Sequence, residues 1–386
     1  MQNLGVPSFA APAALALCFV AACSGVVAEP DEAPAGPLRD GGAPRADAGR
    51  GPDASDPGAT SKRDASSAGR DSAVPNGGVG AGNYRVEDGL LYDGCGEQVV
   101  LRGVNHPTLY VDRAGKAMAQ IARTGANAVR LFWFAKNGVA IGEAEASIEA
   151  AVEHGMLPML EMHDSTCKWD LAGIVDYWTS SEAVALIQRH QQHLLVNIAN
   201  EASPPDGSKF RQGYGDAVKR MRQAGIHVPI VIDGGGCGRN YQMLLDNGPD
   251  VLDQDPDHNL IFSAHLYDPM NADQLGALFD RTVDLSLPFI VGELANKQPP
   301  GCGASLDYKA LLGEAERAQI GWLAWSWGDD NPSTIWNTDC GEFDMTSTFS
   351  YDTLQGWGKE VAVTLDSSIQ NTSLRPYALT HDDRCD

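Results

Sequence analysis

The sequence predicts a (β/α)8 TIM barrel, an α/β fold in which eight parallel strands close into a ring surrounded by helices. Short apolar, β-branched runs alternate with helix-like segments from residue 100 to residue 327. Polar or aromatic residues follow these runs, at the strand ends where such barrels carry their chemistry. Two runs stop on a glutamate that packing does not require, L-L-V-N-I-A-N-E at 194–201 and F-I-V-G-E at 289–293.

The eight strands are predicted from apolar runs whose length suits a buried parallel strand. They cover 100–105, 128–133, 157–163, 194–200, 229–233, 260–267, 289–293 and 322–327. Asp-Gly turns predict a short N-terminal hairpin just before the first core strand, within 84–104.

Helical patterns lie between most of these strands, at 115–124, 142–154, 208–224, 272–283 and 307–318. The third and fifth crossovers have the least clear patterns. Residues 345–369 are expected to complete the last turn of the barrel. An open, doubly wound sheet is the alternative fold. The sequence has no G-x-G-x-x-G or Walker fingerprint, which argues against the nucleotide-binding versions of that fold.

The N-terminus predicts export. Residues 1–22 form an apolar signal peptide of the lipoprotein type, too short for a comfortable membrane span, and V-A-A-C at 20–23 resembles a lipobox in which Cys23 is lipidated. The stretch lacks Lys and Arg, so an ordinary cleaved signal peptide is the alternative. Residues 23–82 are an Ala/Gly/Pro/Asp/Ser-rich linker, too poor in apolar residues to fold, and 83–386 form the catalytic barrel. We expect a bacterial lipoprotein on the outer membrane or cell surface, or a secreted protein.

The charge of the chain limits its partners. The formal net charge is -23, which disfavours nucleic acid and anionic membrane surfaces as ligands. A neutral polysaccharide is not penalised. We therefore expect contact with a membrane only through an N-terminal lipid, and a monomeric protein.

Every predicted strand delivers a polar, ionisable or aromatic group to one rim of the barrel. One such residue would mean little, but eight on the same face are hard to assign to stability alone. The groups are Asn105-His106, Arg130, His163-Asp164, Asn200-Glu201, Asp233, His265-x-Tyr267, Glu293 and Trp325-Ser326-Trp327.

This pattern resembles glycoside hydrolase family 5, and is most similar to the bacterial endo-β-1,4-mannanases of its subfamily 8. The resemblance covers nearly all of 84–330. The matching pieces are L-R-G-V-N-H at 101–106, T-G-A-N-A-V-R at 124–130, H-D at 163–164, N-I-A-N-E at 197–201, I-F-S-A-H-L-Y at 261–267, I-V-G-E at 290–293 and G-W-L-A-W-S-W at 321–327.

The resemblance implies a retaining glycosidase that needs two carboxyl groups and neither a metal nor an organic cofactor. Glu201 would be the acid/base and hold a proton near neutral pH, whereas Glu293 would be the ionised nucleophile. Arg130 and Tyr267 would support the charge of Glu293.

Substrate binding is expected from other rim residues. Asn200 would hold the sugar 2-hydroxyl, His106 and His265 would orient the substrate, and Trp327 would present a flat face to a sugar ring. Asp164 is grouped with them, with loop capping as the alternative. Trp325 is expected in the core.

Two departures from the mannanase pattern concern aromatic residues. Ala202 and Cys237 stand where tryptophans are expected, and the tryptophans that could compensate from other loops are Trp133, Trp169 and Trp336. Setting aside Cys18 and Cys23, six cysteines remain, an even number that suggests up to three disulfides among fifteen full pairings. The expected loop positions favour Cys95–Cys385, Cys167–Cys237 and Cys302–Cys340.

The predicted activity is endo-hydrolysis of a β-1,4-linked polysaccharide, with mannan or glucomannan first and cellulose as the alternative. A non-catalytic carbohydrate-binding lipoprotein is the alternative of another class. A metallohydrolase and a serine hydrolase are disfavoured because the chain has no H-E-x-x-H and no G-x-S-x-G.

Overall fold

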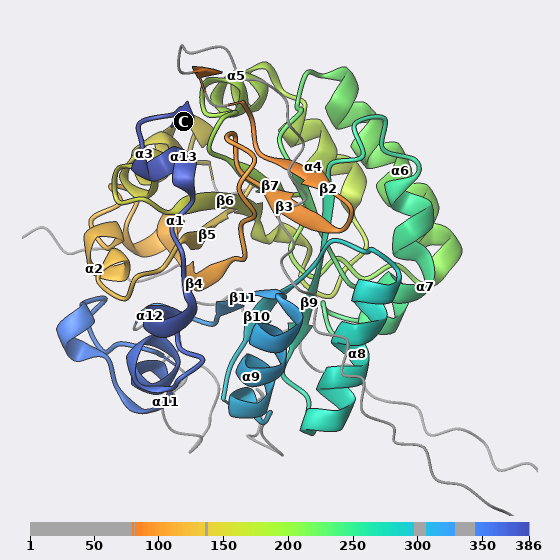
Figure 1. Ribbon diagram of the computed structural model, residues 1–386. Helices are drawn as coiled ribbons and strands as arrows, with labels where there is room; N and C mark the ends of the chain where they lie inside the picture. The colour runs from red at the N-terminus through yellow and green to blue at the C-terminus, as the bar shows by residue number, and fades with distance from the viewer. Residues whose placement is uncertain (1–78, 81, 136–137, 297–305, 329–343, 386) are drawn as a thin grey trace, which may run out of the picture. The chain divides into compact units, whose positions relative to one another are not determined.

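Eight parallel strands close into a barrel in the computed structural model, which describes residues 79–80, 82–135, 138–296, 306–328 and 344–385 (Figure 1). The predicted fold class is confirmed, and each predicted strand overlaps one strand of the barrel. These strands are β4 Arg102–His106, β5 Ala128–Trp133, β6 Leu157–Met162, β7 Leu195–Asn197, β8 Ile230–Asp233, β9 Leu260–Leu266, β10 Phe289–Leu294 and β11 Gly321–Ala324.

The strands follow one another around the ring in chain order, and β11 pairs with β4 to close it. All eight pairings are parallel. The carboxyl ends of all eight strands therefore meet at one rim.

The crossovers between strands carry α1 Thr108–Val111, α2 Met118–Ala122, α3 Glu145–Glu153, α4 Leu171–Trp178, α5 Ser181–Arg189, α6 Gly207–Gln223, α7 Tyr241–Leu252, α8 Ala272–Asp284 and α9 Tyr308–Ala318. The five predicted helices all have counterparts among them. The third crossover, unclear in the sequence, holds α4 and α5, and the fifth holds α7. After β11 the chain forms α11 Gly356–Lys359, a π-helical turn at Glu360–Thr364, α12 Ile369–Thr372 and α13 Tyr377–Thr380.

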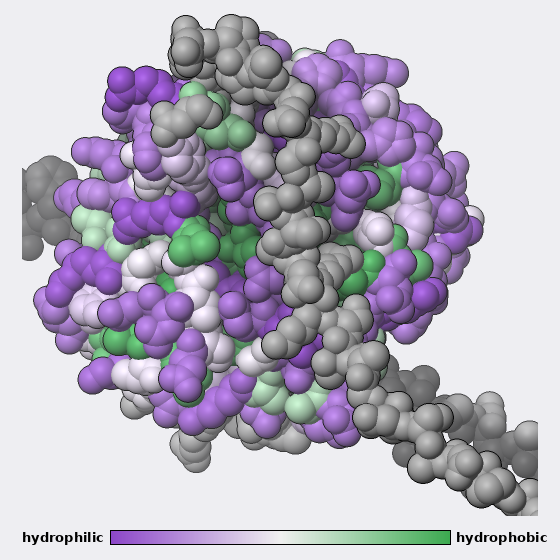
Figure 2. All heavy atoms as spheres, in the orientation of Figure 1, coloured by the Kyte–Doolittle hydropathy of each residue, from purple (hydrophilic) through white to green (hydrophobic). Residues whose placement is uncertain are grey.

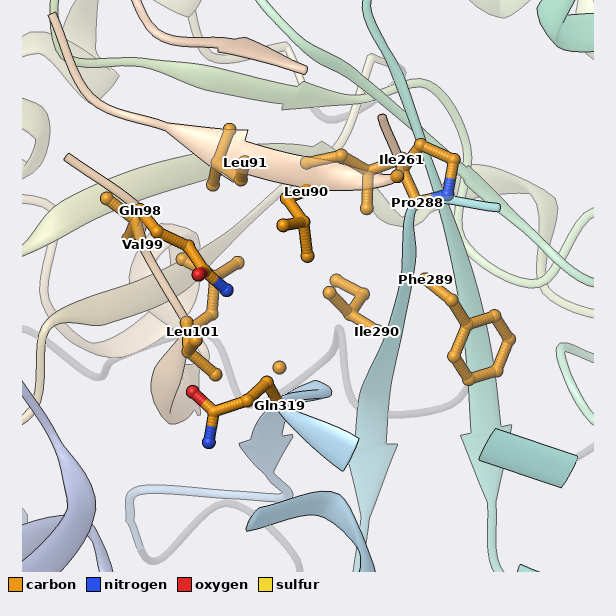
Figure 3. Close-up of a pocket in the computed structure, with 13 residues that line it drawn as sticks. Leu90, Leu91, Gln98, Val99, Leu101, Ile261, Pro288, Phe289, Ile290 and Gln319 are labelled. Carbon is orange, nitrogen blue, oxygen red and sulfur yellow. The ribbon is translucent and has the colours of Figure 1, made fainter. Parts of the chain in front are cut away.

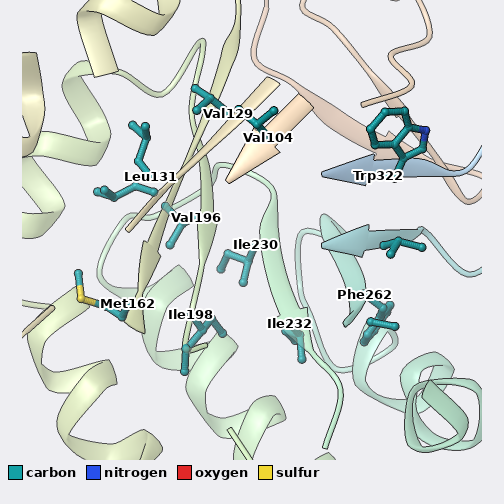
Figure 4. Close-up of a cluster of buried hydrophobic side chains, with 14 of the residues drawn as sticks. Val104, Val129, Leu131, Met162, Val196, Ile198, Ile230, Ile232, Phe262 and Trp322 are labelled. Atoms are coloured by element: carbon teal, nitrogen blue, oxygen red, sulfur yellow. The ribbon is translucent and has the colours of Figure 1, made fainter. Parts of the chain in front are cut away.

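Alternation along each strand separates two apolar cores. On β8, Ile230 and Ile232 point outward into the large core under the helices (Figure 4). Val231, between them, belongs to the second core inside the barrel. The inward core fills the lower half of the barrel and includes Leu157, Met159 and Ile290. Polar residues take over the inward positions only above this layer, toward the carboxyl ends.

A hairpin covers the amino-terminal end of the barrel. Its strands, β2 Arg85–Glu87 and β3 Leu90–Tyr92, pair with each other, as the Asp-Gly turn predicts. A cavity of only about 30 Å³ separates Leu90 and Leu91 from the starts of the barrel strands (Figure 3). This end of the barrel is therefore plugged by side chains.

The two ends of the described chain are joined beside this hairpin. β1 (Val79–Gly80) pairs with β12 (Arg384–Cys385), and a disulfide links Cys95 to Cys385. β1 lies within the stretch predicted as linker, so the described residues include a short part of that stretch. The predicted signal peptide and the rest of the linker lie outside the described residues.

The face seen in Figure 2 is mostly hydrophilic over the outer helices, with hydrophobic residues in small separate groups. Among the helices in the described ranges, none combines the length and the apolar character needed to cross a membrane.

Candidate active site

Glu293 lies at the carboxyl end of β10 and is held by two donors. Arg130 Nη1 donates to its Oε1 at 2.6 Å, and the hydroxyl of Tyr267 donates to its Oε2 at 2.7 Å. Ile290 points into the barrel, so strict alternation of side chains along β10 would point Glu293 outward. The register of β10 against β9 shifts between Val291 and Glu293, which turns Glu293 inward. Gly292 permits this, because a Cβ there would lie 2.1 Å from Ser263 Oγ on β9.

Arg130 is the centre of a polar layer inside the barrel and is only 1% exposed. Besides Glu293, its guanidinium donates to the amide oxygens of Asn105, Asn197 and Asn200 at 2.7–3.0 Å. Burial lowers its pKa, but the nearby carboxylates Glu161, Glu293 and Asp233 outweigh this and raise the pKa. The arginine therefore stays charged.

Glu201 follows β7 in a left-handed backbone conformation, with φ of 50°. Its N–H donates to Asp233 Oδ2 at 3.0 Å, and its carboxyl Oε1 lies 2.9 Å from His265 Nδ1. Burial raises the pKa of Glu201; His265 opposes this, and the charge of Glu293 adds to the increase. The site thus favours the protonated form of Glu201.

His265 lies between the two glutamates. Its Nδ1 is 2.9 Å from Glu201 and 3.3 Å from Glu293 Oε2, and its Nε2 is 3.4 Å from Asp233. Burial lowers the pKa of His265, but the charges of Glu293 and Asp233 raise it to about 9. A cationic His265 balances the carboxylates around it.

The two glutamates are close enough to act on one bond. Their carboxylate oxygens and a nitrogen of His265 all lie within 4.8 Å of one another. Retaining glycosidases hold their two carboxyl groups about 5–5.5 Å apart, and inverting enzymes about 6.5–9.5 Å apart. The spacing fits a nucleophile that attacks the sugar directly.

Three predicted substrate-binding residues lie elsewhere than expected. Trp327 has no exposed surface, and its Nε1–H donates to the carbonyl of Phe349. His106 is also fully buried, with Nε2 3.3 Å from Asp112 Oδ2. Asp164 accepts the N–H of Ala135, which agrees with the loop-capping alternative. Neither Trp327 nor His106 has an exposed ring surface in this structure, so direct sugar contact by these two side chains stays a prediction.

An aromatic wall stands beside the glutamates instead. Trp325, predicted in the core, is half-buried and stacks on Phe132 at 4.8 Å between ring centres. His163 stacks on Phe132 at 4.9 Å, and its Nε2 lies 3.5 Å from Asn200 Nδ2. Its Nδ1 lies 2.9 Å from the buried Glu161. The sequence signal for His163 was its place in the H-D pair at the end of the third predicted strand, two residues after Glu161.

The tryptophans named as compensating platforms do not form one surface. Trp133 is fully buried, and Trp169 is half-buried with its edge against Tyr214. Trp336 lies outside the described residues.

Two of the three predicted disulfides are present. Cys95 pairs with Cys385, and Cys167 pairs with Cys237 at the catalytic rim. Cys302 and Cys340 fall outside the described residues, as does Cys23.

Two groups within the described ranges have metal-ligand spacing. One is Glu201, His265 and Glu293 themselves. The other is Glu145, Glu149 and His190, away from the rim, where Arg189 already donates to Glu145 at 2.7 Å.

Comparisons with known proteins agree with this geometry. Residues 92–331 match the family described as Cellulase (glycosyl hydrolase family 5). A mannan endo-1,4-beta-mannosidase of Salipaludibacillus agaradhaerens is 33% identical, over 78% of this chain and 97% of the relative.

Two solved structures are also similar. A β-mannanase from Thermomonospora fusca has a TM-score of 0.70 at 26% identity, and the match covers 78% of this chain and all of that one. A β-mannanase from Streptomyces thermolilacinus, solved with mannohexaose, has a TM-score of 0.69 at 27% identity and covers 77% of this chain and 98% of that one.

Proposed function

Because the chain belongs to glycosyl hydrolase family 5, we propose that it is a retaining endo-β-1,4-mannanase that acts on mannan or glucomannan. The observation that carries the proposal is the pair Glu201 and Glu293, whose carboxylate oxygens lie within 4.8 Å of each other. The choice of mannan is supported by the similar proteins, which are named as mannanases.

The proposed reaction has two displacements at the anomeric carbon. Glu293 attacks from the α face while Glu201 gives its proton to the leaving oxygen, and a covalent glycosyl-enzyme forms. Glu201, now ionised, takes a proton from water as the water attacks the same carbon from the β face. Glu293 leaves, Glu201 is protonated again, and the sugar keeps its β configuration.

The surrounding residues have separate tasks in this proposal. Arg130 and Tyr267 stabilise the charge that Glu293 carries before attack and after departure. Asn200, fixed by Arg130, faces the position of the sugar 2-hydroxyl. Trp325 and His163 form the wall against which the reacting ring rests.

The function is tested by release of reducing ends from galactomannan, glucomannan, carboxymethylcellulose and xylan. We expect the first two to be cut, with a fast fall in viscosity and β-anomeric products by NMR. Preferential cutting of carboxymethylcellulose would favour the cellulase alternative. Retention of a polysaccharide without any new reducing ends would favour the binding protein.

Trp325→Ala is expected to lower kcat/KM on galactomannan by about ten- to a hundredfold. Loss of an apolar ring contact is worth on the order of 1.5–3 kcal/mol, and each 1.4 kcal/mol is a factor of about ten. Trp327→Phe is the matched control: it should lower the melting temperature while kcat/KM changes little. If Trp327→Phe caused the larger loss of kcat/KM at an unchanged melting temperature, Trp327 and not Trp325 would be the tryptophan that contacts the sugar ring.

Attachment of the protein to a membrane through lipidated Cys23, and its monomeric state, are further proposals that rest on the sequence alone. Mass spectrometry of the mature N-terminus that found an unmodified Cys23 would overturn the first. Light scattering that gave twice the chain mass would overturn the second.

A further inference from the structure

The disulfide Cys167–Cys237 joins the two loops on either side of Glu201. Cys167 follows β6, Cys237 follows β8, and Glu201 follows β7 between them. The Cα atoms of the two cysteines are 4.4 Å apart. The bond therefore fixes the distance between the two loops that flank the backbone of Glu201.

Both cysteines reach the same atom of the glutamate. The N–H of Cys167 donates directly to the backbone carbonyl of Glu201 at 3.1 Å. The N–H of Cys237 donates to Ser203 Oγ at 2.7 Å, and this hydroxyl donates to the Glu201 carbonyl at 3.2 Å. One carbonyl oxygen is thus held from both halves of the disulfide.

This restraint matters because Glu201 has a φ of 50°. A residue with a side chain is unfavourable in this left-handed region and stays there only when its surroundings impose it. Asp233 holds the N–H of Glu201, and the disulfide loops hold its carbonyl. Together they fix the direction in which the carboxyl group points.

The residues next to the cysteines hold the sequence neighbour of Glu201, Asn200, and its hydrogen-bond partner, His265. Thr166 Oγ1 accepts from Asn200 Nδ2 at 2.9 Å, and the carbonyl of Gly238 accepts the N–H of His265 at 3.0 Å. A Cβ on Gly238 would lie 2.7 Å from the His265 ring and 3.0 Å from Glu201 Cγ. The loop after β8 is therefore in close contact with the proton donor and with its histidine.

We propose that Cys167 and Cys237 are positioning residues for the proton donor Glu201, acting through their disulfide. The inference rests on the proposed glycosidase function. Loss of the bond lets the two loops separate, the Glu201 carbonyl loses its fixed donors, and the carboxyl group leaves its line with the leaving oxygen. Arg130 and Tyr267 hold Glu293 from inside the barrel, so the nucleophile keeps its position.

The test is the double variant Cys167→Ala/Cys237→Ala, compared with wild type on two substrates. Mannohexaose has a poor leaving group that needs the proton of Glu201, whereas 2,4-dinitrophenyl β-mannobioside does not. We expect kcat/KM to fall about ten- to a hundredfold on mannohexaose, the range for a slightly misplaced catalytic group, and less than about threefold on the aryl glycoside. The alkaline limb of the pH profile on mannohexaose should also shift.

Cys95→Ala/Cys385→Ala is the matched control, since it removes a disulfide at the opposite end of the barrel. This control should lower the melting temperature and leave the ratio of the two kcat/KM values unchanged. Equal losses on both substrates, or no loss, in Cys167→Ala/Cys237→Ala would overturn the proposal. Wild-type enzyme inactive on both substrates would instead overturn the proposed function.

Ser203→Ala keeps the test decisive if the double variant does not fold. It leaves the disulfide in place but cuts the link from the Cys237 N–H to the Glu201 carbonyl. The same selective loss on mannohexaose, smaller in size, is expected. An unchanged ratio of the two kcat/KM values in Ser203→Ala would count against the proposal.

Discussion

Glu293→Ala is expected to lower kcat/KM on galactomannan by roughly 10⁴–10⁶-fold, the range seen when a catalytic nucleophile is removed. The buried carboxylates Asp233 and Glu161 cannot replace it, because both lie deeper in the barrel with no exposed surface. The product formed with added azide tests the assignment further. Azide can occupy the space of the missing side chain and attack from the α face, which gives an α-mannosyl azide.

The fold is expected to survive this change. Arg130 loses its ion pair with Glu293 at 2.6 Å but keeps those with Glu161 at 3.3 Å and Asp233 at 3.5 Å. Its buried charge therefore stays compensated. Glu293→Gln, which keeps the side-chain volume, is the matched control and should be equally inactive. Near wild-type turnover in either variant would contradict the mechanism.

Glu201→Ala is expected to lower kcat/KM on galactomannan by about 10²–10⁴-fold, the usual contribution of general acid catalysis. On 2,4-dinitrophenyl β-mannobioside, kcat/KM should stay near that of the wild type, because this leaving group needs no proton. The glycosyl-enzyme should then accumulate, since Glu201 is also the base for the second step. Azide should release it as the β-mannosyl azide, opposite to the anomer expected from Glu293→Ala.

The pH profile provides a second measurement of the same group. The pKa of Glu201 is raised by burial, and the protonated form is the active one in the first step. Activity of the wild type on galactomannan should therefore persist above the ordinary pKa of a glutamate and fall as the pH rises through the raised value. This alkaline limb should be absent from the residual activity of Glu201→Ala on the aryl glycoside. An unchanged limb would assign it to another group.

The sequence predicted the barrel well and placed both glutamates at strand ends, because both signals are local. Each strand is a β-branched run with a clear end, and both glutamates stand at such ends. The helices α4 and α5 were harder to see. Helix α4 is short and strongly apolar, so it shows little contrast between a buried and an exposed face. Helix α5 has few apolar residues and spans less than three turns, so its periodic pattern is brief.

Trp325 and Trp327 show where the alternation of side chains along a strand no longer predicts which residue faces the site. β11 ends at Ala324, so Trp325 and Trp327 both lie beyond the part of the chain in which neighbouring side chains point to opposite faces. Which of them faces the cleft is decided by tertiary contacts, such as the stacking of Trp325 on Phe132. The sequence offers no measure of those contacts.

His106 illustrates a related limit. It stands at the end of β4, the expected place for a site residue, yet the ring is enclosed beside Phe349 and Asp112. Phe349 is 243 positions further along the chain, after the last strand of the barrel. Contacts of this range cannot be read from the pattern around the histidine.

The bond between Cys95 and Cys385 has a mechanical consequence. The barrel closes where its first strand, β4, pairs with its last strand, β11. The disulfide connects Cys95, which precedes β4, to Cys385, which follows β11. Tension applied at the two ends of the folded body would pass through the sulfur–sulfur bond and leave the seam between β4 and β11 unloaded. While that bond is intact, the segment between the two cysteines, which are 290 positions apart, cannot be drawn out by its ends.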